Sequence, residues 1–482
     1  MNISLPPINW LSVLPCLVLT ATGILVLFWD LWMQEEERPL LAWLGLIGLL
    51  ITGVVSCALW GRNESAFNGT LALDSYALFF NLIFCLAAGL TLLMSVHYLE
   101  TVDIRSGEYY ALILFATVGM VLMAAATDLI VIFLGLETMS MAVYVLAGIW
   151  RQRLQSNEAA LKYFLLGAFA SGFFLYGVAL VYGVTGSVQL GKIAAQVSTH
   201  GSSPLLLVGV ALLIVGFGFK VAAAPFHVWT PDVYEGAPTT VTAFMAVGVK
   251  AAAFAAFARV FLYALEAIHG EWQGVLWTLS VLTMTVGNVT ALVQSNIKRM
   301  LAYSSIAHAG YLLVAMVAGK DLGGAALLYY LVAYGVMNLG AFGVVIAVGR
   351  KGEPNEEFSD YAGLGFRCPA LGMAMTLFML SLTGVPPLVG FTGKFYIFSA
   401  AVNAGYIGLA IIGVLNSVVS AYYYIRVVVN MYMYEGEKTI DLLSARPALA
   451  VAIILAALGT VLMGVFPSAS ISLARESFLS LG

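Results

Sequence analysis

Charged residues are scarce in this sequence. Asp, Glu, Lys and Arg make up 10% of its 482 residues, whereas soluble globular proteins contain about 25%. Hydrophobic residues reach 61%, and their long runs lack the polar–apolar alternation of a membrane β-barrel. Helices and closed barrels alone satisfy every backbone hydrogen bond in hydrocarbon. The sequence therefore predicts an all-α polytopic membrane protein.

Cysteine is also scarce, and its four copies stand singly in or beside apolar runs. Zinc and iron–sulfur sites need closely spaced ligands, so we expect no metal or redox cofactor in this chain. The net charge of −4 argues against a nucleic-acid partner and leaves the lipid bilayer as the expected environment. Segments between the apolar runs are too short for a soluble domain, so any chemistry must occur within the membrane or at a partner's surface.

Apolar runs bounded by charges, prolines or glycine clusters predict about fourteen membrane spans. The spans cover residues 10–33, 40–60, 75–98, 109–126, 128–150, 157–183, 204–235, 238–262, 271–292, 298–318, 322–349, 370–402, 404–433 and 446–468. Residues 187–198 are predicted to form an amphipathic helix at the membrane surface instead.

Basic residues between the spans divide unequally, and the richer side of a membrane protein is cytoplasmic. The richer side contains Arg38, Arg105, Arg151, Arg153, Lys298, Arg299, Arg350, Lys351, Arg367, Arg426, Lys438 and Arg446. The other side contains Arg62, Lys192, Lys320 and Arg475. With an even number of spans, this division predicts that both termini lie on the periplasmic side.

The remaining basic residues lie inside predicted spans, where a charge at the bilayer centre costs about 2.5 to 3.5 kcal/mol. Arg259 is close to the end of its span, so we expect its side chain to extend to the membrane surface. Lys162 follows Glu158 by one helical turn and could pair with it. Lys220, Lys250 and Lys394 lie too far from the ends of their spans for their side chains to reach the membrane surface easily.

Glu137 is the acidic residue at comparable depth, and one carboxylate cannot neutralise three lysines. Burial favours the neutral form of a lysine, whereas a nearby carboxylate favours the charged form. A movable contact between lysine and glutamate would therefore alternate a lysine between holding and releasing a proton. The pattern favours proton transfer, and a fixed ion pair that orients helices is the alternative.

A proline interrupts the span that contains Lys220. Pro225 cannot donate a backbone hydrogen bond, so the helix should break there and leave carbonyls facing a hydrated pocket. His227 lies two helical turns after Lys220, close to this break. His308, in the middle of another span, is a candidate for the same path or for a hydrogen bond between helices.

A second broken span, at Pro386 and Pro387, contains Lys394. Lys220 and Lys394 are 394 − 220 = 174 positions apart, and Glu137 and His308 are 308 − 137 = 171 apart. A similar offset across an odd number of spans indicates inverted repeats, each with one broken helix. We predict an N-terminal three-helix segment (1–105), a first five-helix repeat (106–265), a second, inverted five-helix repeat (266–435) and a C-terminal helix (436–482).

The chain resembles one known family over nearly its whole length, and four segments carry the most specific similarity. They are LGLETMSMAVYVL (134–146), GFGFKVAAAPFHVWTPDVYEGAPT (216–239), SNIKRMLAYSSIAHAGYLL (295–313) and GVPPLVGFTGKFYIF (384–398). The chain resembles the antiporter-like membrane subunits of proton-pumping NADH-quinone oxidoreductase, or respiratory complex I, which are related to Mrp-type antiporter subunits. Among the L, M and N types, WTPDVYEGAPT and the lysine at 394 resemble the N type.

The resemblance implies a role for each buried group. Glu137 and Lys220 would form the charge-modulating pair, Lys250 would be the central relay and Lys394 would face the exit. His227 and His308 would support transfer through water, and Lys162 would be an auxiliary basic group near the pair.

The resemblance also implies partners and a location. The chain would bind no NADH, flavin, iron–sulfur cluster or quinone; these belong to partner subunits, and neighbouring membrane subunits would contact this chain. The expected location is the bacterial inner membrane. An Mrp-like cation/proton antiporter and a membrane scaffold with vestigial charges are the alternative functions.

Overall fold

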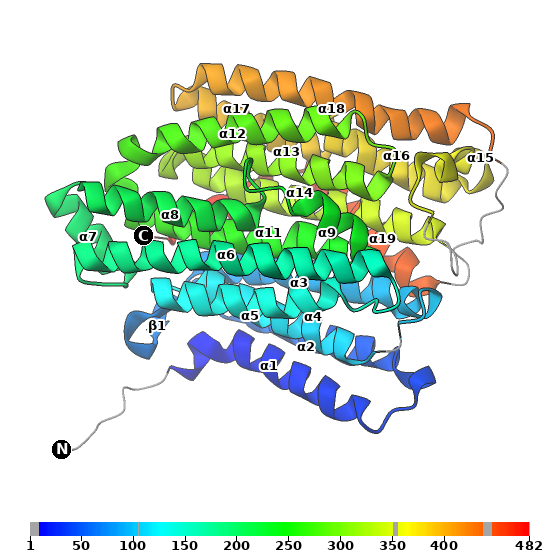
Figure 1. Ribbon diagram of the computed structural model, residues 1–482, viewed down its shortest axis with the longest axis horizontal. Helices are drawn as coiled ribbons and strands as arrows, with labels where there is room; N and C mark the ends of the chain where they lie inside the picture. Colours follow the sequence, from blue (N-terminus) through cyan, green and yellow to red (C-terminus); the bar gives the residue numbers. More distant parts are fainter. Residues whose placement is uncertain (1–8, 105, 350–354, 437–445, 482) are drawn as a thin grey trace.

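The computed structural model describes residues 9–104, 106–349, 355–436 and 446–481. These residues form one bundle of helices that run roughly parallel to the long axis of the molecule (Figure 1). The helices are α1 (Trp10–Asp30), α2 (Leu40–Ala58), α3 (Ser75–Thr101), α4 (Glu108–Ala125), α5 (Leu129–Ala147), α6 (Leu154–Thr185), α7 (Leu190–His200), α8 (Pro204–Val221), α9 (Thr230–Gly236), α10 (Thr239–Phe244), α11 (Lys250–Arg259), α12 (His269–Ala291), α13 (Ile297–Val317), α14 (Lys320–Val348), α15 (Leu364–Arg367), α16 (Pro369–Thr383), α17 (Val389–Asn403), α18 (Ile407–Met433), α19 (Pro447–Val465) and α20 (Ser468–Leu479).

The predicted spans are confirmed. Thirteen helical segments of the described chain are long and apolar enough to cross a membrane, three of them joining adjacent helices. The span predicted at 370–402 consists of two short helices, α16 and α17, separated at the predicted prolines. The segment predicted to lie at the surface contains α7, which is too short to cross a bilayer.

Five helices of the described chain, α1, α3, α5, α8 and α13, start at a polar residue whose side chain caps them. The carboxylate of Asp128 accepts a hydrogen bond from the backbone N–H of Ile130 (2.9 Å) at the start of α5. The side chain of Asn296 accepts one from the N–H of Arg299 (3.0 Å) at the start of α13. Such caps satisfy donors that have no partner within the helix, so apolar runs begin at defined residues.

Glycines allow the helices that contain the candidate residues to approach closely. A Cβ at Gly119 of α4 would lie 2.5 Å from the backbone nitrogen of Met139 in α5. A Cβ at Gly287 of α12 would lie 2.6 Å from the nitrogen of Ala307 in α13. Small residues at such contacts are typical of membrane helix packing, and here they fix the positions of α5 and α13.

From α1 to α18 the bundle broadly follows the order of the sequence across its width, whereas α19 and α20 return to the middle, in contact with α3 and α14. In Figure 1, α1 lies at one edge, α17 and α18 lie at the opposite edge, and α11 and α14 lie between them. α10 and α11 are joined by a π-helical segment, and every residue of the Thr239–Ala264 span's most apolar window is buried. The centre of the molecule is therefore a protein interior shielded from lipid.

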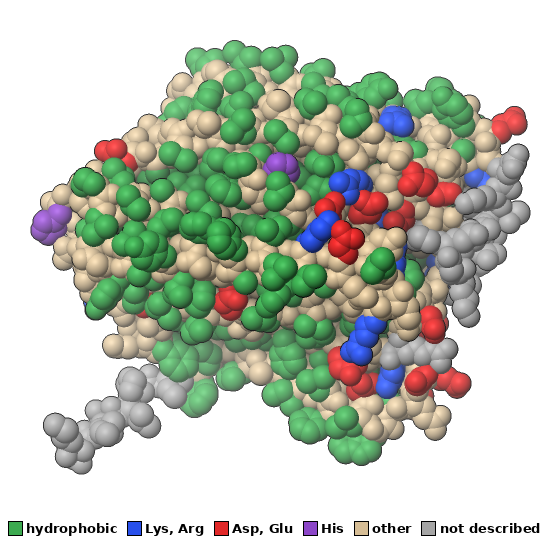
Figure 2. Space-filling model, in the orientation of Figure 1, with side chains coloured by type: hydrophobic (Ala, Val, Ile, Leu, Met, Phe, Trp, Pro, Cys, Tyr) green, Lys and Arg blue, Asp and Glu red, His purple; other side chains and the backbone are tan. Residues whose placement is uncertain are grey.

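Charged side chains gather at one end of the visible face, whereas green apolar side chains cover the middle (Figure 2). This distribution agrees with a membrane-embedded middle. The orientation of the termini stays a prediction. Four of the basic residues on which it depends, Arg105, Arg350, Lys351 and Lys438, lie outside the described residues.

The expectation that Arg259 extends to the membrane surface is wrong. Its side chain is 2% exposed and forms a bidentate ion pair with Asp74: Nη1 lies 2.9 Å from Oδ2, and Nη2 lies 3.0 Å from Oδ1. Its Nε also donates to the carbonyl of Ala124 (3.0 Å). The paired carboxylate was overlooked because it lies 185 positions away in the sequence, at the start of α3. A partner of opposite charge allows burial that an isolated arginine could not tolerate.

Two small elements were not predicted. Strands β1 (Glu64–Ala66) and β2 (Leu71–Leu73) form an antiparallel hairpin between α2 and α3. α20 follows α19, so the C-terminal segment contains a second helix. The Ser480 hydroxyl, just after α20, accepts a hydrogen bond from the N–H of Tyr76 (2.9 Å), which ties this end of the chain to α3.

Candidate functional site

Three of the predicted lysines are buried at separate positions across the bundle. Lys220 on α8, Lys250 on α11 and Lys394 on α17 are 3%, 2% and 4% exposed. None of them forms an ion pair with a carboxylate of the described chain. A buried ammonium group without a counter-ion is costly, so the groups that surround each lysine determine what it can do.

The first break occurs where the sequence predicted it. α8 ends four residues before Pro225, and α9 begins only at Thr230. The carbonyl of Phe219, in the last turn of α8, accepts hydrogen bonds from the backbone N–H of Ala222 (3.2 Å) and from the indole N–H of Trp229 (3.1 Å). The N–H of Ala224 donates to the Thr283 hydroxyl on α12 (2.9 Å). The broken segment is thus held by side chains in place of helical hydrogen bonds.

Lys220 lies in the last turn of α8 and points toward α5. Its ammonium group donates to the hydroxyl of Ser140 (2.7 Å) and to that of Tyr144 (3.1 Å). Glu137 lies one helical turn before Ser140 on the same helix and accepts a hydrogen bond from Ser171. Glu137 and Lys220 are close enough to interact electrostatically, but the described contacts contain no direct bond between them. The Lys220 ammonium group is therefore hydrogen-bonded to neutral hydroxyls, and the Glu137 carboxylate lies one helical turn away from Ser140.

Lys250 begins α11, directly after the π-helical segment 245–249. Its ammonium group donates to the backbone carbonyl of Ser305 on α13 (2.5 Å) and to the hydroxyl of the same residue. The ring of Tyr334 on α14 lies 5.4 Å from it, within range of a cation–π interaction. Lys250 is thus bound by neutral oxygens and an aromatic face.

His308 lies one helical turn after Ser305 on α13. Its Nδ1 lies 2.7 Å from the Tyr330 hydroxyl, and its Nε2 lies 3.1 Å from the Tyr424 hydroxyl. The Tyr424 hydroxyl is also hydrogen-bonded to Ser304. Both ring nitrogens therefore have hydroxyl partners, from α14 and α18, and hydroxyls can act as donors or acceptors. The sequence predicted this histidine, and the structure places it within a continuous polar group.

Lys394 lies in α17, after the second break. Its ammonium group donates to the carbonyls of Leu382 (2.8 Å) and Thr383 (2.9 Å), at the C-terminus of α16, and to the Ser417 hydroxyl (2.9 Å). Gly384, with φ 97°, adopts the left-handed backbone that ends α16. The carbonyls freed by the break are therefore ligands of a buried cation.

An apolar cavity of about 820 Å³ opens beside Lys394. Its walls are mainly side chains of α17 and α18, including Phe391, Phe395, Phe398, Ile411, Val414 and Val418. Lys394 and Ser417 are among its few polar lining residues. Of the predicted path residues, Lys394 is thus the closest to the edge of the bundle that α17 and α18 form.

His227 and Lys162 lie away from these contacts. His227 is half-buried in the segment between α8 and α9, and the structure gives it no hydrogen bond to any of the buried lysines. Lys162 is paired with Glu158 (2.6 Å), as the sequence suggested, and also with Asp232 (2.8 Å). Its side chain is 40% exposed, so water screens these pairs.

The hydroxyl partners were missed by sequence reasoning. Ser140 and Tyr144 follow Glu137 at helical spacings of three and seven, and Ser305 precedes His308 by three. Such spacings place side chains on one face of a helix. The spacing was therefore visible in the sequence. Ser and Tyr are common in membrane helices, however, and spacing alone does not show which of them contact a lysine on another helix.

These features define a class of protein. Broken helices at membrane depth, with a buried lysine beside each break, are the architecture of membrane proteins that translocate ions. The model of the NADH:quinone oxidoreductase/Mrp antiporter transmembrane family matches residues 126–420. The chain belongs to this family.

Curated relatives support the N type. The chain is 52% identical, over 98% of its length and 97% of the relative's, to NADH-quinone oxidoreductase subunit N of Trichlorobacter lovleyi. It is 46% identical, over 100% and 99% of the two lengths, to the protein of that name in Chloroflexus aggregans. The predicted resemblance to the N type is thereby confirmed.

Solved structures have the same fold. A chain of respiratory complex I from Thermus thermophilus superposes with a TM-score of 0.80, at 38% identity, over 95% of this chain and 98% of that one. A chain of the archaeal membrane-bound sulfane sulfur reductase gives 0.84 at 25% identity, over 98% and 97%. A chain of the Mrp complex from Dietzia gives 0.82 at 21% identity, over 98% and 97%, which is a likeness of fold alone.

Proposed function

We propose that this chain is a proton-translocating, N-type membrane subunit of a bacterial NADH-quinone oxidoreductase. It would lie in the inner membrane with both termini on the periplasmic side, in contact with other membrane subunits of the complex. Electron transfer from NADH to quinone would occur in partner subunits, which would bind the flavin, the iron–sulfur clusters and the quinone. The relatives named subunit N, which match almost the whole chain, support this assignment.

The proposed path runs through Glu137, Lys220, Lys250, His308 and Lys394. Its main support is that, among the described residues, the three buried lysines are bound by hydroxyls, carbonyls and aromatic rings and not by carboxylates. Such partners stabilise an ammonium group less than a carboxylate does, so the proton is easier to release. His227 and Lys162 would assist from the side through water.

Movement of the Lys220 side chain would change its proton affinity. Next to Glu137, an ammonium group is stabilised by the opposite charge, whereas next to Ser140 and Tyr144 it is not. A shift between these partners would therefore load and unload the lysine. Redox events in partner subunits would act on this equilibrium electrostatically, as a coupling free energy between distant sites.

The test uses Lys250→Met in the purified complex reconstituted into vesicles. Methionine keeps the approximate length of the side chain and removes the proton-carrying group. We expect quinone reduction coupled to proton pumping to fall about tenfold, which corresponds to about 1.4 kcal/mol in the barrier. Normal pumping per electron in a fully assembled variant complex would refute the assigned path.

A free-standing or Mrp-like cation/proton antiporter is the second candidate, supported by the fold that this chain shares with the Mrp complex chain. Purification with native partners distinguishes the two functions. Co-purifying flavin and iron–sulfur subunits would establish the oxidoreductase, whereas a set of small transporter subunits would establish the antiporter.

A further inference from the structure

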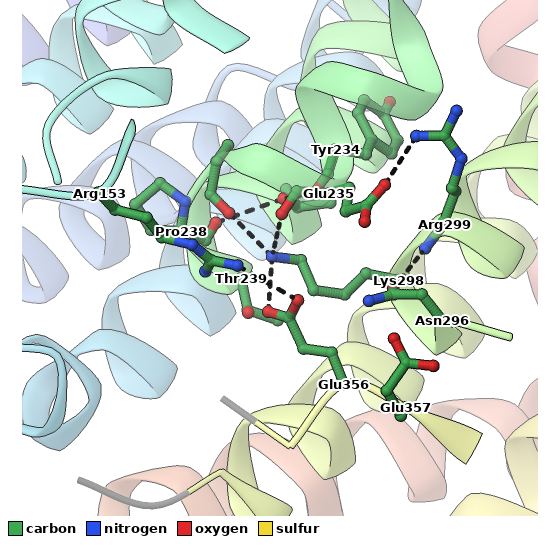
Figure 3. A network of polar contacts seen from close by, with 12 residues as sticks. Arg153, Tyr234, Glu235, Pro238, Thr239, Asn296, Lys298, Arg299, Glu356 and Glu357 are labelled. Atoms are coloured by element: carbon green, nitrogen blue, oxygen red, sulfur yellow. Dashed lines mark hydrogen bonds and ion pairs between the residues drawn. The ribbon is translucent and has the colours of Figure 1, made fainter. Parts of the chain in front are cut away.

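A second group of buried charges lies outside the proposed path, at the charged end of the molecule. Lys298 in the first turn of α13 is 0% exposed, and Glu356, in the segment between α14 and α15, is 5% exposed. With Arg153 and Glu235 they form what we call the Lys298 junction. Figure 3 shows the lysine side chain extending between the segment around Glu235 and the carboxylate of Glu356.

The Lys298 ammonium group binds the end of a helix. It donates to the backbone carbonyls of Glu235 (3.0 Å) and Ala237 (2.9 Å), at the C-terminus of α9. The last carbonyls of a helix have no partner within it and carry partial negative charge, so a cation there is stabilising. α9 is the second part of the first broken helix, and Lys298 is thus its C-terminal cap.

Glu356 completes the coordination of this lysine. Its Oε1 lies 2.9 Å from the Lys298 ammonium group, and its Oε2 lies 3.7 Å from a guanidinium nitrogen of Arg153, just before α6. Its backbone carbonyl accepts a hydrogen bond from the N–H of Ile297 (2.7 Å). One residue therefore contacts the start of α6 and the start of α13, and through Lys298 it reaches the end of α9.

A more exposed layer of ion pairs surrounds the junction. Arg299 donates to Asp232 (2.9 Å) and to the carboxylate of Glu235 (2.7 Å), with side chains 30 to 36% exposed. Exposed pairs contribute less than buried ones, because water screens them. The buried contacts of Lys298 are therefore the ones expected to fix the position of α9.

The junction is connected to two lysine sites of the proposed path. α9 is joined to Lys220 through the eight-residue break between α8 and α9. Ser305, the partner of Lys250, lies seven residues after Lys298 on α13, two turns further on the same face and about 10 Å along the axis. Lys298 thus joins the first broken helix to the helix that binds the central lysine.

We propose that Lys298 is a positioning residue of the proton path: its cation caps α9 against α13 and so sets the Lys220 site relative to the Lys250 site. This inference rests on the proposed function. Lys298 itself carries no proton along the path, since its contacts are with helix ends and Glu356. Removing its charge should loosen α9 and impair proton transfer in a complex that still assembles.

The experiment compares Lys298→Met with Lys298→Arg in the purified, assembled complex. Proton pumping per electron is measured in vesicles, and backbone hydrogen exchange is measured across residues 230–237. We expect Lys298→Met to lower the pumping ratio at least threefold and to speed exchange in this segment at least tenfold. Lys298→Arg retains the cation and should restore both values to within about twofold of the original.

The chain offers a matched control in the Asp74–Arg259 pair, a buried ion pair on helices away from α9. Arg259→Met should leave exchange across 230–237 unchanged. If it accelerates this exchange as Lys298→Met does, the effect is general destabilisation and the inference is wrong. Glu356→Gln keeps an oxygen acceptor and removes the charge, so it should lower the pumping ratio and speed exchange across 230–237, each less than Lys298→Met does. It replaces Lys298→Met as the test variant if the Lys298→Met complex does not assemble.

The outcomes separate the inference from the proposed function. Normal pumping in Lys298→Met, with pumping lowered about tenfold in Lys250→Met, would overturn the positioning role alone. Normal pumping in Lys250→Met would overturn the path itself. Loss of pumping in Lys298→Met without faster exchange at 230–237, or without rescue by Lys298→Arg, would also contradict the positioning role.

Discussion

The two broken helices hold their lysines in opposite ways. In the first, Lys220 precedes the break by a few residues and donates to side-chain hydroxyls of another helix, Ser140 and Tyr144. In the second, Lys394 follows the break and donates to two carbonyls of the helix that has just ended. The same elements, a proline break and a lysine, thus produce two different environments.

The difference concerns how firmly each proton is held. Side-chain hydroxyls rotate and can release Lys220, and Glu137 lies one turn away as another partner. The carbonyls at the end of α16 are fixed and carry the partial negative charge of a helix C-terminus, which favours a cation at Lys394. We infer that Lys220 changes partners during turnover, whereas Lys394 stays in place.

Lys220→Ala tests the first half of this comparison and should have the largest effect. It removes the group that would change partners, so we expect proton pumping by the assembled complex to fall at least tenfold, or about 1.4 kcal/mol. The measurement is acidification of vesicles during quinone reduction, with assembly checked by subunit content. A normal rate and a normal proton-to-electron ratio would remove Lys220 from the path.

Glu137→Gln removes the alternative partner while keeping hydrogen-bonding capacity toward Ser171. Without the negative charge, the protonated form of Lys220 loses its stabilisation, and we expect pumping to fall about fivefold, or about 1 kcal/mol. The same assay applies, with Glu158→Gln as the control, since that carboxylate pairs with the more exposed Lys162. An equal loss in both variants would contradict a specific role for Glu137.

Lys394→Met tests the second half of the comparison. Water can occupy the carbonyl oxygens of Leu382 and Thr383 in place of the ammonium group, so we expect a loss of about threefold, smaller than at Lys220. Lys394→Arg should retain most of the activity, because its cation can still bind the fixed carbonyls. A larger loss for Lys394→Met than for Lys220→Ala would reverse the comparison.

The sequence predicted the breaks because proline acts locally. Pro225 and Pro386 each prevent a helical hydrogen bond wherever the chain places them. The burial of Arg259 depended on Asp74, which is distant in the sequence, and no local pattern indicated their contact. The hydroxyl partners of the lysines belong to the same category, since each comes from another helix.

The inverted repeats stay a prediction, because an offset between residues in the sequence does not establish that their positions in the fold are equivalent. The offset between Lys220 and Lys394 suggested equivalent positions, but one lysine lies before its break and the other lies after it. Equal spacing in a sequence therefore does not imply equal environment. Depth in a span indicated which residues would be buried, whereas their partners required the three-dimensional arrangement.

Ser140→Ala and Ser417→Ala form the most direct comparison, because each removes one hydroxyl from one lysine. Ser417→Ala leaves Lys394 its two carbonyls, so we expect pumping to change by less than about 1.5-fold. Ser140→Ala leaves Lys220 with the Tyr144 hydroxyl and shifts it toward Glu137. Losing one hydrogen bond of about 0.5 to 0.8 kcal/mol should then slow proton release about two- to fourfold. Equal effects in the pumping assay would show that Lys220 is held as firmly as Lys394, and that the proposed change of partners does not occur.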